Sequence, residues 1–270
     1  MIDSIKKSSI EFFNTNGLPS KKLENWKFTS SKNFKNFNKS LSLDEIKKIE
    51  SDELSIVFIN GVLDKHSLEN FKFTYLIEVK NLNELTEKEL LYCSESFLNE
   101  SMFNLGVSEF ENGSYISFKE NSVIEEVINI KNYFFENGQN ERVSSFNIFH
   151  INERSEISII EEDIKENFSI FNLKLNKFIC ENSSIFKHGK SYNDDSQTHS
   201  LSYNYYQIEQ DVALNVDSMV KSSFFNKEFI EVDLNKVGSD AKINILNLGK
   251  EEQHVDNNIL INHKAEHCTS

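Results

Sequence analysis

The side chains best suited to chemistry gather at the end of the chain, in "EEQHVDNNILINHKAEHCTS". Within fifteen positions this stretch contains three histidines and one cysteine: His254, His263, His267 and Cys268. Imidazole and thiolate groups bind zinc, iron and iron–sulfur centres, so these four residues are candidate metal ligands. Their spacing matches no closed zinc module. In a strand, residues four positions apart are separated by about 13 Å, too far for one ion. A structural role is therefore the favoured interpretation for each histidine taken singly, and no firm metal ligand is assigned.

Other catalytic motifs are missing from the sequence. It contains no glycine-rich phosphate loop, no G-x-S-x-G elbow and no H-E-x-x-H motif. Acidic pairs are frequent, and we interpret them as exposed turn charges: Glu125-Glu126, Glu161-Glu162 and Asp194-Asp195. His188 and His199 flank a polar stretch, residues 189–198, that is predicted to be a loop.

The elements that would position these residues are mostly strands. After about Asn104, short segments of alternating apolar and polar residues follow one another at intervals of roughly ten residues, which is typical of strands with one buried face. A sandwich of hairpins and a solenoid of parallel strands both fit this spacing. Because hairpin dipeptides are scarce, a solenoid is favoured, with Asn and Asp at its turns and a continuous dry column inside.

The first third of the chain is predicted to mix α and β structure. Residues 2–16 show helical spacing, and Gly17 and Pro19 end that helix. The single tryptophan, Trp26, is expected to anchor the following segment to the body, together with Phe28. Asn60-Gly61 predicts a hairpin, and residues 83–102 a further helix. We therefore divide the chain into residues 1–103, a helical and α/β region, and residues 104–270, a mainly β region.

Charge and cysteine content limit the possible partners and compartment. The formal charge of −14 disfavours nonspecific nucleic-acid binding, because phosphate backbones require clustered lysine and arginine. Residues 1–50 nevertheless carry ten lysines and six acids, so this segment either folds back onto an acidic body or binds an acidic partner. Neither a secretion signal nor a membrane span is apparent. The three cysteines, Cys93, Cys180 and Cys268, are far apart, which fits a reducing cytoplasm.

The motifs at both ends resemble the SufB/SufD family of iron–sulfur cluster assembly proteins, and SufD more than SufB. "GLPSKKLENWKFTS" is similar to the SufD-type pattern of Gly-Leu-Pro, a basic pair, then Glu-x-Trp-(Lys/Arg)-(Tyr/Phe)-Thr. "IVFINGVLDKHS" is similar to a family strand ending in Asn-Gly. The final stretch resembles the family's Gln-His-x-Asp-(Asn/Asp), followed by a His and a Cys-x-Ser. We assign structural roles to five motif residues: Pro19, Glu24, Trp26, Asn60 and Gly61.

The resemblance implies a fold and a function. The fold is a right-handed parallel β-helix, preceded by a small α/β region and followed by helices. The function is that of a non-catalytic scaffold, which joins a SufB-like paralogue and a SufC-type ATPase in cluster assembly or iron acquisition. No cofactor would be bound tightly, and an Fe–S cluster would be present only transiently in the complex.

One departure from the family pattern is expected to matter. Family members continue past the Cys-x-Ser motif with further coils and terminal helices, whereas this sequence stops at Ser270. We therefore expect a fragment or a truncated chain that is prone to aggregate when produced alone. Two other functions stay open, a β-helix enzyme acting on polysaccharide and a metal-binding module built from the terminal His and Cys residues.

Overall fold

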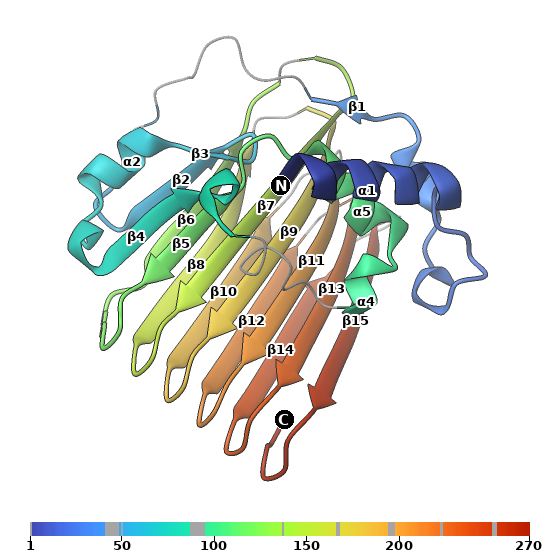
Figure 1. The fold of residues 1–270 in the computed structure, drawn as a ribbon. Coiled ribbons are helices and arrows are strands. Elements are labelled where there is room, and N and C mark those ends of the chain that lie inside the picture. Colours follow the sequence, from blue (N-terminus) through green and yellow to red (C-terminus); the bar gives the residue numbers. More distant parts are fainter. Residues whose placement is uncertain are drawn as a thin grey trace.

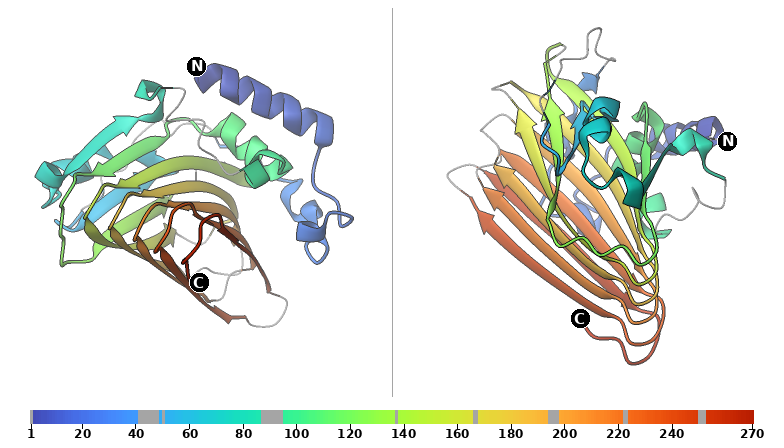
Figure 2. Two further views of the ribbon diagram at one scale, coloured as in Figure 1. Left: turned by 60° about the horizontal axis from the view of Figure 1, so that its bottom comes forward. Right: turned by 90° about the vertical axis from the view of Figure 1, so that its left-hand side faces the viewer.

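A computed structural model describes residues 2–40, 49, 51–86, 95–136, 138–165, 168–193, 198–221, 224–249 and 253–270. In this part of the chain two β-sheets face each other, and successive coils stack in sequence order (Figures 1 and 2). Sheet A has the strand order β15-β13-β11-β9-β7-β5-β4, with β1 beside β7, and sheet B the order β14-β12-β10-β8-β6-β2-β3. The predicted mainly β solenoid is confirmed.

The coils alternate between the two sheets, one strand in each. Sheet A contains β5 (Ser114–Phe118), β7 (Glu141–Ile151), β9 (Ile170–Cys180), β11 (Thr198–Ile208), β13 (Phe225–Leu234) and β15 (His254–His263). Sheet B contains β6 (Ile128–Phe134), β8 (Glu156–Lys165), β10 (Ile185–Asn193), β12 (Ala213–Lys221) and β14 (Asp240–Leu248). These strands pair in parallel within each sheet.

The first third of the chain adds strands to both sheets. β2 (Ser55–Ile59) pairs in parallel with β6, and β3 (Val62–Leu63) pairs antiparallel with β2. β4 (Ile77–Asn81) pairs antiparallel with β5, and β1 (Asn38–Lys39) pairs in parallel with β7. The division at residues 103 and 104 stays a prediction, although strands from before it enter both sheets.

The Asn60-Gly61 hairpin is confirmed. Both residues have positive φ, 44° and 79°, as a two-residue type I′ turn requires. The Asn60 amide also imitates a strand neighbour: its Nδ2 donates to the Phe135 carbonyl (3.0 Å), and the Phe135 N–H donates to its Oδ1 (2.8 Å). A side chain at position 61 would press against β7, because an added Cβ would lie 3.1 Å from the Ser145 Cβ.

Sheet A turns into sheet B at a corner that repeats in every coil. One residue at each corner has a positive φ: Asn121, Arg154, Ser183, Asp211, Gly238 and His267. Asn and Asp hold only two of these six corners, so the prediction that they serve as the general turn residues holds for only some of the turns, among them those at Asn60 and Asn140. The reason lies in the ladder between coils, since the N–H of Asn121 donates to the carbonyl of Glu153, and that of Arg154 to the carbonyl of Asn182. These bonds offset the unfavourable backbone conformation of other residue types.

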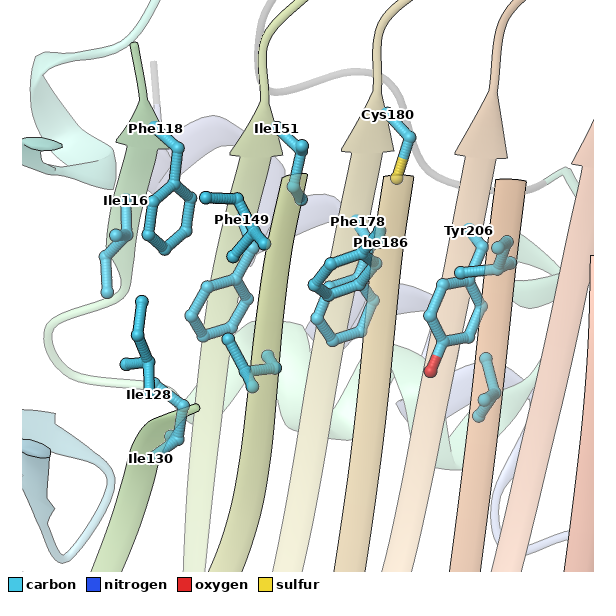
Figure 3. Packing of buried hydrophobic residues seen from close by; sticks show 14 of the residues in the cluster. Ile116, Phe118, Ile128, Ile130, Phe149, Ile151, Phe178, Cys180, Phe186 and Tyr206 are labelled. Carbon is cyan, nitrogen blue, oxygen red and sulfur yellow. The ribbon is translucent and has the colours of Figure 1, made fainter. Parts of the chain in front are cut away.

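The half of the solenoid interior nearest these corners is apolar. Inward-facing rings and aliphatic side chains of both sheets interdigitate there (Figure 3). Phe178 stacks on Phe149 at 5.3 Å and on Tyr206 at 4.7 Å between ring centroids, so one aromatic column crosses three coils.

The other half of the interior is polar, so the predicted dry column fills only the half nearest these corners. Glu161 faces inward from the middle of β8 and is 4% exposed, which corrects its interpretation as an exposed turn charge. Lys174 Nζ lies 2.7 Å from both Glu161 Oε1 and Asp163 Oδ1. One coil further along, Lys190 pairs with Glu228. Glu125 and Glu126 do lie at the surface, while Asp194 and Asp195 fall outside the described residues.

Burial and pairing act against each other on these charges. Burial alone would lower the pKa of Lys174, but Asp163 and Glu161 raise it well above its ordinary value. Burial also raises the pKa of Asp163, because Lys174 does not fully compensate two neighbouring carboxylates. Burial opposes ionisation of Glu161 as well, yet Lys174 and His188 hold its pKa below the ordinary value. The pair of carboxylates is therefore held together by one lysine.

Helices cover the outer face of sheet A. α1 (Ile2–Asn16) packs on α5 (Ser101–Glu109), and both lie on the same side of the solenoid (Figure 2). α5 approaches β9 closely, because a Cβ added at Gly106 would lie 3.1 Å from Leu175. α1 and its end at Gly17 (φ 66°) are as predicted. The helix predicted at 83–102 is shifted: residues 82–84 form the 3₁₀ turn η4, α4 spans Glu95–Leu98, and 87–94 fall outside the described residues.

Three short elements complete the described chain. The 3₁₀ turns η1 (Glu24–Trp26) and η2 (Ser31–Phe34) follow α1, and α2 (Lys65–Asn70) follows β3, with η3 (Thr74–Leu76) before β4. Asp64 caps α2 by accepting from the N–H groups of His66 and Ser67. No described helix is long and apolar enough to cross a membrane.

Candidate functional site

The N-terminal motif lies on the outer face of sheet A, against the last coils. We call residues 20–37 the strap; it passes beside β13 and β15 (Figure 1). Pro19 is buried at its start, and Trp26 is completely buried. The Trp26 ring lies 6.0 Å from the rings of both Phe34 and Phe229. Trp26 is thus the anchor that the sequence predicted, whereas Phe28 is 75% exposed and corrects that part of the prediction.

Polar groups fix the orientation of the Trp26 indole. Its Nε1 donates to Glu100 Oε2 at 2.9 Å, immediately before α5. Lys227 Nζ lies 5.0 Å from the centre of the indole and 4.7 Å from that of Phe229. A cation between two ring faces is attracted by both, so the lysine contributes to anchoring the strap.

A chain of hydrogen bonds joins the strap to β15. The Thr29 hydroxyl donates to Asp256, and its oxygen lies 3.0 Å from His254 Nε2. Because the one hydroxyl proton goes to Asp256, His254 Nε2 must carry a proton and donate to Thr29. Lys227 Nζ donates to the same Asp256 oxygen at 2.6 Å. We call His254, Thr29, Asp256 and Lys227 the latch.

The latch is partly withdrawn from water, which sets its charges. Burial lowers the pKa of His254, and Asp256 only partly opposes this shift. A neutral imidazole agrees with the tautomer derived above. Burial also lowers the pKa of Lys227, and the hydrogen bond that its ammonium donates to Asp256 opposes this shift. The latch therefore contains one compensated ion pair and one neutral histidine, an arrangement suited to holding two chain segments together.

The structure separates His254 from the other three candidate metal ligands. His254 and His263 lie at opposite ends of β15, about 30 Å apart at the usual rise of a strand. His267 is the positive-φ residue of the last corner, and His263 Nε2 lies 3.0 Å from Ser270 Oγ. No group of three His, Cys, Asp or Glu side chains in the described ranges could hold a metal ion. A role in metal binding stays a prediction.

Cys268 occupies a position that serines hold at other corners. It follows His267, as Ser155 follows Arg154 and Ser239 follows Gly238. Its Sγ donates to the carbonyl of Lys236 at 3.1 Å, just as Ser155 Oγ donates to the carbonyl of Lys119 at 2.9 Å. The terminal His-Cys pair is therefore one more repeat of the solenoid corner.

The remaining motif residues lie elsewhere. Glu24 begins η1 and is exposed. Asn60 borders a cavity of about 400 Å³ between the hairpin, the end of α5 and β7. Arg142 lies in its wall, bonded to Glu109 through Nε and Nη2 at 2.7 and 2.5 Å and to the Phe37 carbonyl through Nη1. The donors of this arginine are thus engaged by the protein itself.

The predicted loop between His188 and His199 was wrong for its described part. His188 and Gly189 lie inside β10, and His199 lies in β11; residues 194–197 fall outside the described chain. His188 is buried, its Nδ1 lies 2.8 Å from the Tyr206 hydroxyl, and burial lowers its pKa. Cys93 also falls outside the described residues, while Cys180 is buried and Cys268 is half-buried.

Sequence reasoning missed two residues that complete the site, Glu100 and Lys227. Lys227 sits at an outward-facing position of β13 between Phe225 and Phe229. A lysine that alternates with aromatic residues along a strand can lie against their rings. The sequence pattern alone does not show this for Lys227, because the contact also requires Trp26, which comes from a distant part of the chain.

Comparison with known families agrees with this architecture. Residues 134–270 match the model of the SufBD core domain of the SUF system for FeS cluster assembly. The match begins at the end of β6 and includes β15 and the last corner. No curated protein shows a significant match to the chain. Because the matched residues make up just over half of the sequence, the chain belongs to the SufBD family, which acts in iron–sulfur cluster assembly.

Proposed function

We propose that this protein is a SufD-like, non-catalytic scaffold subunit of an iron–sulfur cluster assembly complex in the cytoplasm. It would work with a SufB-like paralogue and a SufC-type ATPase, in cluster assembly or in iron acquisition. The observation that carries this proposal is the match to the SufBD core domain over residues 134–270. The SufD-type strap motif, in which Trp26 packs on Phe229 of β13 and Thr29 bonds to His254 of β15, supports the finer assignment.

The surroundings of the candidate reactive groups support a structural role. His254 donates to Thr29, and Cys268 donates to a backbone carbonyl at a solenoid corner. Glu161 is engaged by Lys174 inside the solenoid. Side chains that form hydrogen bonds and ion pairs within the protein in this way stabilise its fold. An Fe–S cluster would then be cargo of the whole complex, bound transiently at positions that include groups from partner subunits.

Co-expression tests the proposal. The chain, produced with a SufB-like protein and a SufC-type ATPase from the same genome, should elute with both from an anaerobic size-exclusion column. A matched control replaces the ATPase by an unrelated ABC-type ATPase, which should elute separately. Failure of the chain to associate with either Suf-type protein under anaerobic conditions would contradict the proposal.

A further inference from the structure

The strap has an outer face that its anchoring role does not explain. The strap and the following two residues of β1, residues 20–39 together, contain six lysines and a single acid, Glu24, and all six lysines are exposed. We call these residues the lysine strip: Lys21, Lys22, Lys27, Lys32, Lys35 and Lys39. The latch and the buried rings of Trp26 and Phe34 hold the strap down from its inner side.

The lysine strip is largely uncompensated. Lys39 lies 4.0 Å from Glu111, while the other five lysines have no ion pair within the part of the chain that the structure describes. Several surface lysines elsewhere do pair, as Lys72 does with Glu126 and Lys131 with Asp52. The chain as a whole carries a formal charge of −14, so this basic strip stands out against an acidic molecule.

Two large apolar side chains project from the same strip. Phe28 is 75% exposed and Leu23 is 50% exposed. Lys27 Nζ lies 5.4 Å from the centre of the Phe28 ring. An apolar surface with a polar or charged rim is a feature of protein-binding sites.

We propose that the outer face of the strap is a docking surface for an acidic protein segment that carries apolar side chains. Its carboxylates would pair with the lysine strip, and its apolar side chains would cover Phe28 and Leu23. Charge complementarity argues for this occupant. A nucleic acid is disfavoured, because its regularly charged backbone would also meet the acidic body beside the strap. The inference rests on the proposed function in one respect, that a scaffold acts by binding proteins.

Fluorescence polarisation tests this docking with defined probes. The probe is a short fluorescein-labelled peptide of glutamates interrupted by leucines. Two comparison probes are the same peptide with lysines in place of glutamates, and a single-stranded DNA oligonucleotide of equal charge. We expect saturable binding of the acidic peptide that weakens about tenfold when ionic strength rises from about 0.05 to 0.5 M, and weaker binding of both comparison probes.

Two variants, each with three lysines replaced by serine, locate the binding surface. Lys21→Ser/Lys22→Ser/Lys27→Ser should weaken binding about tenfold, and Phe28→Ser should do the same by removing an apolar anchor. The matched control changes three exposed lysines on the outer face of sheet B: Lys187→Ser/Lys221→Ser/Lys242→Ser. It alters the net charge equally and should bind as the unmodified protein does. Circular dichroism should show that all variants remain folded.

Three results would overturn the inference: no saturable binding of the acidic peptide, an equal loss of peptide affinity in both triple-lysine variants, or tighter binding of DNA than of the peptide. None of these measurements involves a Suf-type partner. The peptide-binding experiment and the co-elution experiment therefore test the two proposals independently. A negative result in one does not contradict the proposal tested by the other.

Discussion

Removal of Lys174 tests whether the polar half of the solenoid interior is held by its ion pairs. The substitution Lys174→Met keeps most of the length of the side chain, which becomes one atom shorter, and removes its charge. Glu161 and Asp163 would then face each other inside the solenoid without a cation between them. Both acids are buried, with side chains 5% and 3% exposed.

The expected loss follows from distance and burial. At 2.7 Å and an effective dielectric constant of about 20, each lysine–carboxylate attraction amounts to about 6 kcal/mol. Most of this offsets the transfer of three charges out of water, so removal of one partner should destabilise the fold by about 3–5 kcal/mol. The two carboxyls can relieve the loss by taking up protons. Their pKa values would then exceed those of the unfolded chain, and stability would fall as the pH rises through the folded-state values.

Urea unfolding followed by far-UV circular dichroism measures this effect at pH 5 and pH 8. Lys174→Met should lose about 3–5 kcal/mol at pH 8 and less at pH 5, by about 1.4 kcal/mol for each unit of raised pKa. Adding Glu161→Gln and Asp163→Asn should recover most of the loss. Lys187→Met, on the outer face of β10 in the opposite sheet at 54% exposure, is the matched control and should change little. A Lys174→Met protein within about 1 kcal/mol of the unmodified one at pH 8 would refute the reasoning.

Three substitutions and one chemical modification test the strap, the latch and the cysteines. Trp26→Ala should lower the free energy of unfolding by about 3–5 kcal/mol, and a loss under 1 kcal/mol would contradict burial of the indole. Thr29→Val should lower it by about 1–3 kcal/mol and speed proteolysis of the strap; unchanged proteolysis would argue against the latch. Cys268→Ser should preserve both stability and metal content, since serine makes the same bond at other corners; stoichiometric zinc lost in this variant would restore the metal-binding hypothesis. Cys180 should resist iodoacetamide in the folded protein, because burial raises the pKa of its thiol, and modification as fast as that of Cys268 would show that the solenoid opens.

The strands and the N-terminal anchor were predictable because their signals are local. Apolar and polar residues alternate at positions 169–175, which predicts a strand. The structure has this strand as β9. Gly17 and Asn60-Gly61 have backbone requirements that few other residues meet, so the end of the first helix and the hairpin could be placed.

The interior and the corners could not be predicted from local pattern. Polar residues such as Asn176 and Lys174 alternate with apolar ones as if they faced solvent, yet they face inward because helices cover the other side of sheet A. Corner residues such as Arg154 and Ser183 carry no turn signal, since hydrogen bonds from the next coil stabilise their conformation. The latch was also hidden, because Thr29 and Asp256 are 227 positions apart in sequence.

Fe–S enzyme activity in cells tests the central claim most directly, namely that this solenoid is a scaffold for cluster assembly. Deletion of the gene should lower the activity of an enzyme that requires an Fe–S cluster, and the level of that enzyme's polypeptide should stay unchanged. Expression of the protein should restore the activity, and expression of the Trp26→Ala variant should restore less of it. Full Fe–S enzyme activity in the deletion strain, under iron limitation as well as in iron-replete medium, would contradict the account.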